Sequence, residues 1–339
     1  MEANPSARDD AQAPNSGVND GARPARAVPL ESAEWTRLVD AHYELGESPF
    51  WHPLESMLYW VDIPGKKILR ANVYMGTAQV WDMPSEPGCI APAQGGGLVI
   101  ALRHGVFRTR EWGDPLEPLV TLPYDTATVR ANDGKCDALG RFWVGTIDEP
   151  KAGHHAALFS IDCRAGAAGV ERKAGDALTA NGLAWSPQGT TLYWADTPNH
   201  VVHAWDYTPD TNALSAHRIH LRFAPKPAGW TFEDTSYQGR PDGAAVDVAG
   251  NYWVSMFEGR RVCCFAPDGT LLRQIATPAQ CPTMPCFGGE DLRTLYLTTA
   301  RHGRSAAELA AFPDSGAVFF MRMDTPGLPV NMFAGTTAQ

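Results

Sequence analysis

Six segments of this chain repeat one pattern: a short strand, a turn rich in Gly, Asp and Pro, and a second strand that carries Tyr, Trp or Val. The copies begin at residues 47, 89, 132, 181, 242 and 283, so successive starting points lie 42, 43, 49, 61 and 41 residues apart. A period in the forties, with about four strands in each unit, is typical of a β-propeller blade. The sequence therefore predicts an all-β protein folded as one six-bladed β-propeller with a central channel, rather than βαβ units or a β-sandwich of about seven strands.

In four of the six copies the first position is polar, and it is occupied by Glu47, Asn132, Asn181 and Asp242. The innermost strand of each propeller blade lines the channel, so we expect these side chains to meet at one channel mouth. Two carboxylates with amide oxygens form a hard ligand set that suits Ca²⁺, Mg²⁺ or Mn²⁺. The competing interpretation is that Asn and Asp merely form tight turns, but Glu47 has no special role in turns.

Further polar residues flank this ring. Arg130 stands two residues before Asn132, and alternation along a strand predicts that both side chains face the channel mouth. The Arg130 guanidinium then either binds a hydroxyl or carboxylate of a ligand or neutralises the acidic ring. Asp133 is interpreted as a turn residue. Asp148 and Glu149 follow the strand RFWVGT, so either one of them binds a polyhydroxylated ligand or both are solvated loop carboxylates.

Composition limits the partners and the domain organisation. The chain of 339 residues has 28 Lys and Arg against 38 Asp and Glu, and its net charge of −10 argues against nucleic acid or an anionic membrane as partner. Residues 1–35, rich in Ala, Pro, Asn, Asp and Arg, are predicted to be a disordered extension, and residues 36–339 a single propeller domain. No stretch resembles a secretory signal or a membrane span.

The cysteines and the missing motifs narrow the class further. Seven cysteines, an odd number without framework spacing, favour free thiols and a cytoplasmic protein. The chain contains no G-x-S-x-G, H-E-x-x-H, Walker or G-x-G-x-x-G motif. Serine hydrolase, zincin and nucleotide-binding mechanisms therefore have no local support.

These residues together resemble the gluconolactonase and regucalcin family, which also includes the luciferin-regenerating proteins (SMP-30-like proteins). The resemblance rests on five motifs that occur in order: GESPFW around Glu47, R-x-NDGK-x-D-x-x-GR-F-W-x-GT from Arg130 to Thr146, NGLAWS at Asn181, PDG at Asp242, and CFGG from Cys286 to Gly289. The matching region runs from about residue 40 to about residue 325. The resemblance implies a six-bladed propeller that holds one divalent cation at the channel mouth and hydrolyses sugar lactones to aldonic acids.

The resemblance also implies a division of labour within the ring. Carried over onto matching positions, Glu47, Asn181 and Asp242 would be the metal ligands, with Ca²⁺ the expected ion and Mg²⁺, Mn²⁺, Zn²⁺ or Fe²⁺ the alternatives. Asp242 would also be the candidate general base, in competition with water activated by the cation itself. Arg130 and Asn132 would contact the sugar.

The family's further substrate-binding glutamate matches less directly. In the third copy of the repeat the second strand ends in the sequence GTIDEP. Glu149 therefore stands one residue away from the position that this glutamate usually has in the family. Glu149 is the expected substrate contact and Asp148 the alternative.

The predicted function is metal-dependent hydrolysis of a pentono- or hexonolactone, a carboxylic ester hydrolase reaction of carbohydrate catabolism. The expected partner is a small sugar lactone, and the expected state is a monomer or weak homo-oligomer. The alternatives are a calcium-binding regulatory propeller without turnover, a propeller that binds a partner peptide, and a lactonase or esterase for non-sugar substrates. An arginine beside a complete ligand set favours the enzyme.

Overall fold

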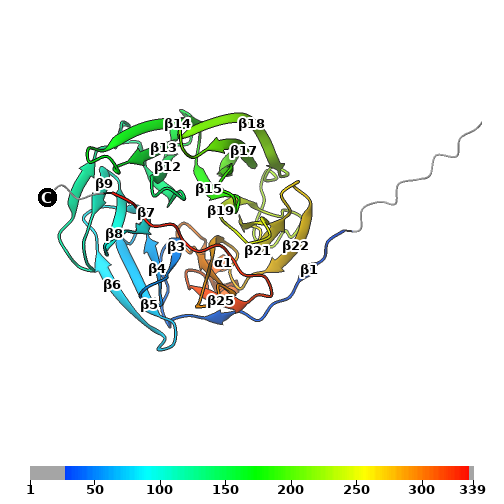
Figure 1. Cartoon of the computed structure of the whole chain (residues 1–339). Coiled ribbons are helices and arrows are strands. Elements are labelled where there is room, and N and C mark those ends of the chain that lie inside the picture. The colour runs from blue at the N-terminus through cyan, green and yellow to red at the C-terminus, as the bar shows by residue number, and fades with distance from the viewer. Residues whose placement is uncertain (1–26, 336–339) are drawn as a thin grey trace, which may run out of the picture.

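The computed structural model describes residues 27–335, whose strands form six β-sheets arranged as the blades of a propeller (Figure 1). Blade one comprises β3 (Gly46–His52), β4 (Met57–Asp62), β5 (Lys67–Asn72) and β6 (Thr77–Asp82). Blade two comprises β7 (Pro87–Pro92), β8 (Leu98–Leu102), β9 (Gly105–Arg108) and β10 (Glu117–Val120). Blade three comprises β11 (Val129–Cys136), β12 (Phe142–Asp148), β13 (Ala156–Asp162) and β14 (Gly169–Ala177).

The second half of the ring repeats this plan. Blade four comprises β15 (Ala180–Trp185), β16 (Thr191–Asp196), β17 (Val201–Thr208) and β18 (Ala213–Arg222). Blade five comprises β19 (Arg240–Val246), β20 (Tyr252–Phe257), β21 (Arg261–Phe265), β22 (Leu271–Ala276) and an added β1 (Leu30–Glu31). Blade six comprises β23 (Pro282–Gly288), β24 (Thr294–Thr299), β25 (Phe319–Arg322) and β2 (Thr36–Arg37). The only helices in the described residues are η1 (Thr197–Asn199) and α1 (Ala306–Ala311). The predicted all-β six-bladed propeller is confirmed.

The N-terminal strands close the ring. β2 pairs antiparallel with β25 and so supplies the outermost strand of blade six, which joins the beginning of the chain to its end. β1 pairs parallel with β22 at the edge of blade five. Strand pairing thus begins at residue 30, before the domain start that the sequence predicted at residue 36. The rest of that prediction concerns residues 1–26, which lie outside the described residues.

The hydrophobic core is divided among the blade interfaces. Six clusters of buried apolar residues lie between successive blades, and each draws its side chains from the two sheets that it joins. The largest fully buried side chains include Trp60 in blade one and Trp143 in blade three. The inner strands contact one another in the order β3, β7, β11, β15, β19 and β23, and β23 contacts β3 again. Their first residues therefore surround one end of the ring axis, which we call the site mouth.

The repeated Asp, Gly and Trp of the sequence pattern have a structural role in the inner hairpins. Asp137 accepts hydrogen bonds from the backbone of the following turn and, at 3.1 Å, from the indole nitrogen of Trp143. Asp247 does the same for its own turn and for Trp253, at 2.9 Å. His52 and Ser186 fill the same position in blades one and four and also accept turn N–H groups. This part of the repeat stabilises the fold and not the site.

Each inner strand is irregular just after it begins. The pairing with the second strand shifts register between residues 47 and 50, 87 and 89, 131 and 134, 181 and 184, 241 and 244, and 282 and 285. Such bulges change the direction of the side chains beside them. Ser48 and Gly182, which directly follow Glu47 and Asn181, both have positive φ, at 50° and 60°. The repeat thus places a bulge at the same point as the polar residue.

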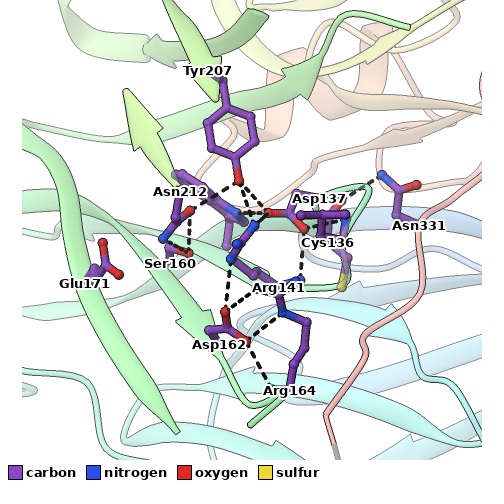
Figure 2. Close-up of polar contacts among 12 residues, drawn as sticks. Cys136, Asp137, Arg141, Ser160, Asp162, Arg164, Glu171, Tyr207, Asn212 and Asn331 are labelled. Atoms are coloured by element: carbon purple, nitrogen blue, oxygen red, sulfur yellow. Dashed lines mark hydrogen bonds and ion pairs between the residues drawn. The ribbon is translucent and has the colours of Figure 1, made fainter. Parts of the chain in front are cut away.

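The opposite end of the ring axis, which we call the far end, is crossed by the C-terminal segment. This segment is hydrogen-bonded to blade five through Leu328 N–H and Val246 O, and to blade two through Phe333 N–H and Pro92 O. Asn331 donates to Cys136 O of blade three at 3.1 Å (Figure 2). A cavity of about 270 Å³ lies beneath the segment, lined mostly by aromatic and apolar side chains and by prolines.

A buried polar network near the far end joins blades three and four. The hydroxyl of Tyr207 donates to Asp137 at 2.7 Å, and Asp137 also pairs with Arg141 at 3.2 Å (Figure 2). Asn212 and Ser160 extend the network between the same two blades. Every carboxylate in this network is paired with a hydrogen-bond donor, so we infer that the network stabilises the packing of the two blades.

Candidate functional site at the channel mouth

The four in-register polar residues come together at the site mouth. Three of them form a chain of hydrogen bonds across blades three, four and five. Asn132 Nδ2 donates to Asn181 Oδ1 at 2.9 Å, and Asn181 Nδ2 donates to Asp242 Oδ1 at 2.5 Å. Each of the three side chains is buried, as is Glu47. Convergence of residues separated by up to 195 positions follows from the circular repeat and from nothing local.

Glu47 and Asp242 form a buried pair of like charges. Burial raises the pKa of Glu47 well above its ordinary value, and the nearby carboxylates of Asp242 and Asp133 raise it further. Burial likewise raises the pKa of Asp242, to about 8, although Arg240 opposes this effect. Glu47 Oε2 is buried without a hydrogen-bond partner. A cation between the two carboxylates would remove both the repulsion and the unpaired oxygen.

The residues fit a hard divalent cation on chemical grounds. In residues 27–335 no three His, Cys, Asp or Glu side chains form a metal-binding cluster. A cation held by Glu47 and Asp242 would therefore need a further ligand of another type, such as an amide oxygen. Asn181 is placed for that role because it touches Asp242. Its NH₂ group now faces Asp242 and Thr197, so ligation through Oδ1 requires the amide to turn over. Two carboxylate groups and one amide oxygen match Ca²⁺, Mg²⁺ or Mn²⁺.

Arg130 lies beside Asn132 at the same mouth, as strand alternation predicts. Its guanidinium donates to Asn132 Oδ1 at 3.0 Å and to the Ala131 carbonyl at 2.9 Å. Asn132 Nδ2 also donates to Ala180 O, which fixes the amide orientation. Arg130 is 9 % exposed, so most of its side chain is covered by the protein. Arg130 and Asn132 thus form a preorganised polar pair beside the carboxylates.

The structure distinguishes Glu149 from Asp148. Glu149 lies 3.5 Å from Arg130 Nε and binds Arg103 through both oxygens, at 2.8 and 3.0 Å. Asp148 is buried and accepts the backbone N–H groups of Gly153 and His155, so it holds the turn after β12 together. Glu149 is therefore the carboxylate on the Arg130 side of the mouth.

Sequence reasoning missed three charged residues and misread a fourth. Asp133, expected in a turn, lies in β11 and accepts the Leu183 N–H of blade four at 2.8 Å. Lys135 donates to Leu183 O at 2.9 Å and to the Ala244 carbonyl, and its charge opposes the effect of burial on the pKa of Asp133. Arg240 stands two residues before Asp242, the offset that separates Arg130 from Asn132. The repeat alignment contained that signal.

Lys151 is the third missed residue. It is exposed, has a positive φ of 54°, and lies in the turn after β12. Although the residue is exposed overall, desolvation of part of its side chain lowers the pKa of its ammonium group, Arg240 lowers it further, and Asp242 raises it. The turn after β12 lies at the site mouth because β12 ends opposite the start of β11. No sequence motif marks this position, because only the ring brings blade three near Asp242.

The long connection before blade five packs at the same end of the ring. Tyr237 is buried, and its hydroxyl contacts His200 Nε2 at 2.7 Å, next to η1. Trp230 packs edge-on against Tyr237, and Lys226 Nζ lies 2.8 Å from Glu258, which directly follows β20. The sequence left two roles open for this segment, a cover for the mouth or a surface loop. Its contacts place it on the rim of the site mouth.

The fold and the site define a class: a β-propeller with a cluster of buried carboxylates and amides at one mouth and a guanidinium beside it. Comparison with known proteins gives the family. Residues 45–301 match the family model described as the SMP-30/gluconolactonase/LRE-like region. The chain belongs to this family, as its motifs indicated.

Two relatives and one solved structure define its neighbourhood. The chain is 40% identical over 291 residues to a 6-deoxy-6-sulfogluconolactonase of Pseudomonas putida, covering 86% of this chain and 95% of that protein. It is 33% identical to regucalcin of Danio rerio, with the same coverage. A calcium-binding protein, regucalcin, of Agrobacterium tumefaciens superposes with a TM-score of 0.81 at 21% identity, over 91% of this chain and 99% of that one. The last match supports the fold alone.

The structure also describes the cysteines and the lengths of the helices. All seven cysteines are buried and free, so none forms a disulfide. Among the described residues there is no helix with the length and apolar character needed to cross a membrane.

Proposed function

We propose that this lactonase hydrolyses a sugar lactone to the aldonic acid with one divalent cation held by Glu47, Asn181 and Asp242. The family and the P. putida relative support the reaction class. The buried carboxylate pair with the unpartnered Glu47 Oε2 is the single observation that carries the cation site. Ca²⁺ is the proposed ion, and a small sugar lactone is the proposed partner.

The chain's own residues have separate tasks. When bound, a divalent cation polarises the lactone carbonyl and stabilises the negative charge that develops on its oxygen. Asp242 accepts the proton of the attacking water and returns it to the ring oxygen as the ester bond breaks. Arg130 and Asn132, already hydrogen-bonded to each other, bind the ring hydroxyls and orient the carbonyl. Glu149 orients Arg130 and accepts a hydrogen bond from a hydroxyl group of the sugar.

The surroundings follow from the same residues. Seven free thiols suit a reducing compartment, and we propose the cytoplasm. The propeller's six interblade cores require no partner chain, which is consistent with a monomer or a weak homo-oligomer.

The test is pH-stat hydrolysis of a lactone panel by metal-stripped protein. Ca²⁺, Mg²⁺, Mn²⁺, Zn²⁺ and Fe²⁺ are added back singly, and spontaneous hydrolysis is subtracted. We expect a saturable rate that depends on one of the cations and is lost on chelation. Cation binding without hydrolysis of any lactone would instead identify a regulatory propeller, and hydrolysis without any cation would overturn the proposed site.

A further inference from the structure

One side of the site mouth carries more positive charge than its carboxylates can balance. Arg240 begins β19, and its guanidinium lies 3.2 Å from Glu258 Oε2. The same carboxylate also forms ion pairs with Lys226 at 2.8 Å and with Arg304 at 3.1 Å. Arg304 is shared with Glu308, but Arg240 and Lys226 have only Glu258 as an ion-pair partner in residues 27–335. Two carboxylates, Glu258 and Glu308, therefore face three cations.

Lys151, in the turn after β12, adds a further cation at the same end of the ring. Among residues 27–335 it has no ion-pair partner, and the residue is exposed. Desolvation and the charge of Arg240 lower the pKa of its ammonium group, and the charges of Asp242 and Glu258 raise it. Arg240 lies at the mouth on blade five, two residues before Asp242, and Lys151 follows the second strand of blade three at the same end.

This surplus differs from the rest of the mouth. On the other side, Arg103 is held between Glu86 and Glu149, with both oxygens of each carboxylate engaged. Arg130 is balanced by Glu149 and bonded to Asn132. A cation at Glu47 and Asp242 would neutralise those carboxylates. Arg240 would then have only Glu258, which it shares with Lys226 and Arg304, and Lys151 would have no ion-pair partner among residues 27–335.

A neutral sugar does not explain that surplus. Hydroxyl groups need hydrogen-bond partners, whereas clustered like charges repel one another and cost free energy unless an anion joins them. A guanidinium offers a planar fork that matches the oxygens of sulfonate, phosphate or carboxylate, and an ammonium supplies a point charge beside it. The segment 223–239, tied to Glu258 through Lys226, borders this side of the mouth.

We propose that Arg240 and Lys151 form a subsite for an anionic substituent on the exocyclic carbon of the lactone, so that the substrate class is an acidic sugar lactone. This inference rests on the proposed function, since it assumes that the lactone carbonyl lies at Glu47 and Asp242. The ring then spans the opening from the carboxylates to the Arg240 side, and the anion ends between the two cations. The shared chemistry is a sulfonate, phosphate or carboxylate, and the panel below separates them.

The first test compares kcat/KM for glucono-1,5-lactone, 6-phosphogluconolactone, 6-deoxy-6-sulfogluconolactone and glucaro-1,4-lactone, which carries a free C6 carboxylate, at saturating cation. We expect at least one acidic lactone to exceed the neutral one by about tenfold or more, with the gap shrinking as salt rises. Lys151→Gln and Arg240→Gln should each reduce that ratio about tenfold. Arg218→Gln on β18, where the exposed arginine pairs with Asp206, is the control and should leave the ratio unchanged.

A binding measurement separates the subsite from the reaction. Calorimetric titration of 6-phosphogluconate and of gluconate into the protein should show tighter binding of the former, and Lys151→Gln should weaken it selectively. Lys151 is exposed, so this variant tests the subsite even where Arg240→Gln disturbs folding through Glu258. Selective binding without any hydrolysis would remove the proposed function and leave the subsite. Equal rates and equal binding of acidic and neutral compounds, or ratios unaltered in both variants, would overturn the subsite.

Discussion

The site mouth and the far end are built from the same six inner strands, yet their chemistry is opposite. At the site mouth Asn132, Asn181 and Asp242 are buried and joined by hydrogen bonds through Asn181, and Glu47 is buried as well. At the far end the same strands finish in Trp51, Trp185 and Phe287, which line an apolar cavity beneath the C-terminal segment. Burial of apolar surface stabilises the fold, whereas burial of like charges opposes it.

The difference teaches where function and stability are located. A buried carboxylate pair opposes folding, so we interpret the pair at the site mouth as a ligand site. The C-terminal segment seals the other end and ties blade five to blades two and three. Variants at the site mouth should therefore change activity more than stability, and variants at the far end should do the reverse.

The largest effect is expected for Asp242→Asn. Loss of one ligand and of the proposed base should lower kcat/KM by at least about 10³-fold and weaken cation binding. Stopped-assay rates and calorimetry with Ca²⁺ or Mn²⁺ measure both. Asp133→Asn is the matched control, because Asp133 is also a buried carboxylate at this mouth but lies outside the ligand set. Wild-type cation affinity in Asp242→Asn would contradict the assignment.

Phe333→Ala tests the far end. Phe333 is 1 % exposed and packs between blades two and three, so its truncation leaves a cavity and should cost about 3 to 4 kcal/mol of unfolding free energy. Urea denaturation measures this loss, and kcat/KM at a temperature where the variant stays folded should match wild type. A loss of activity that stability does not explain would break the separation of the two ends.

Glu258→Gln sits between these cases, because Glu258 stabilises the rim through charge. Burial would raise the pKa of Glu258, but Arg240, Lys226 and Arg304 outweigh burial and hold it below its ordinary value of 4.5. Because the pKa of Glu258 is lower in the folded protein than in the unfolded chain, its ionised form stabilises the fold at pH values above 4.5. This stabilisation is lost as the pH falls through the pKa of the folded state. We expect Glu258→Gln to cost about 2 kcal/mol at pH about 7, less than for a fully buried pair.

The same variant gives a pH test with a definite sign. Wild type and Glu258→Gln should differ most in unfolding free energy near neutral pH and converge as pH falls well below 4.5. Denaturant titrations at several pH values measure the difference. A gap that widens with acid would show that Glu258 is not held ionised by its three cations.

The smallest effect is expected for Arg130→Lys. The ammonium keeps the charge but loses the fork that bonds Asn132 and the Ala131 carbonyl together. We expect KM to rise so that kcat/KM falls about tenfold, with cation affinity unchanged. Steady-state kinetics beside a cation titration check this. An unchanged KM would place Arg130 in charge neutralisation, the alternative that the sequence left open.

Much of the fold and part of the site could be predicted because a circular repeat converts sequence register into spatial position. The start of each copy gave Glu47, Asn181 and Asp242, and the same alignment held the unused signal of Arg240. Glu149 and Asp148 could not be told apart, since one residue of register decides which faces Arg130.

Other features left no periodic trace. β1 is two residues long and pairs with a strand more than 240 positions away. The C-terminal segment PGLPVNMF has no strand pattern, and only its contacts with blades two, three and five reveal its role. Lys151 reaches the site from a turn whose position depends on the complete ring.

The most direct test of the site is a parallel titration of metal-stripped wild type, Glu47→Gln and Asp242→Asn with a divalent cation, following binding heat and lactone hydrolysis in the same samples. The structure predicts one cation per wild-type chain, a hydrolysis rate that rises with the same midpoint as binding, and loss of both in each variant. Hydrolysis that proceeds without cation, or wild-type cation binding in either variant, would contradict a site built from these two carboxylates.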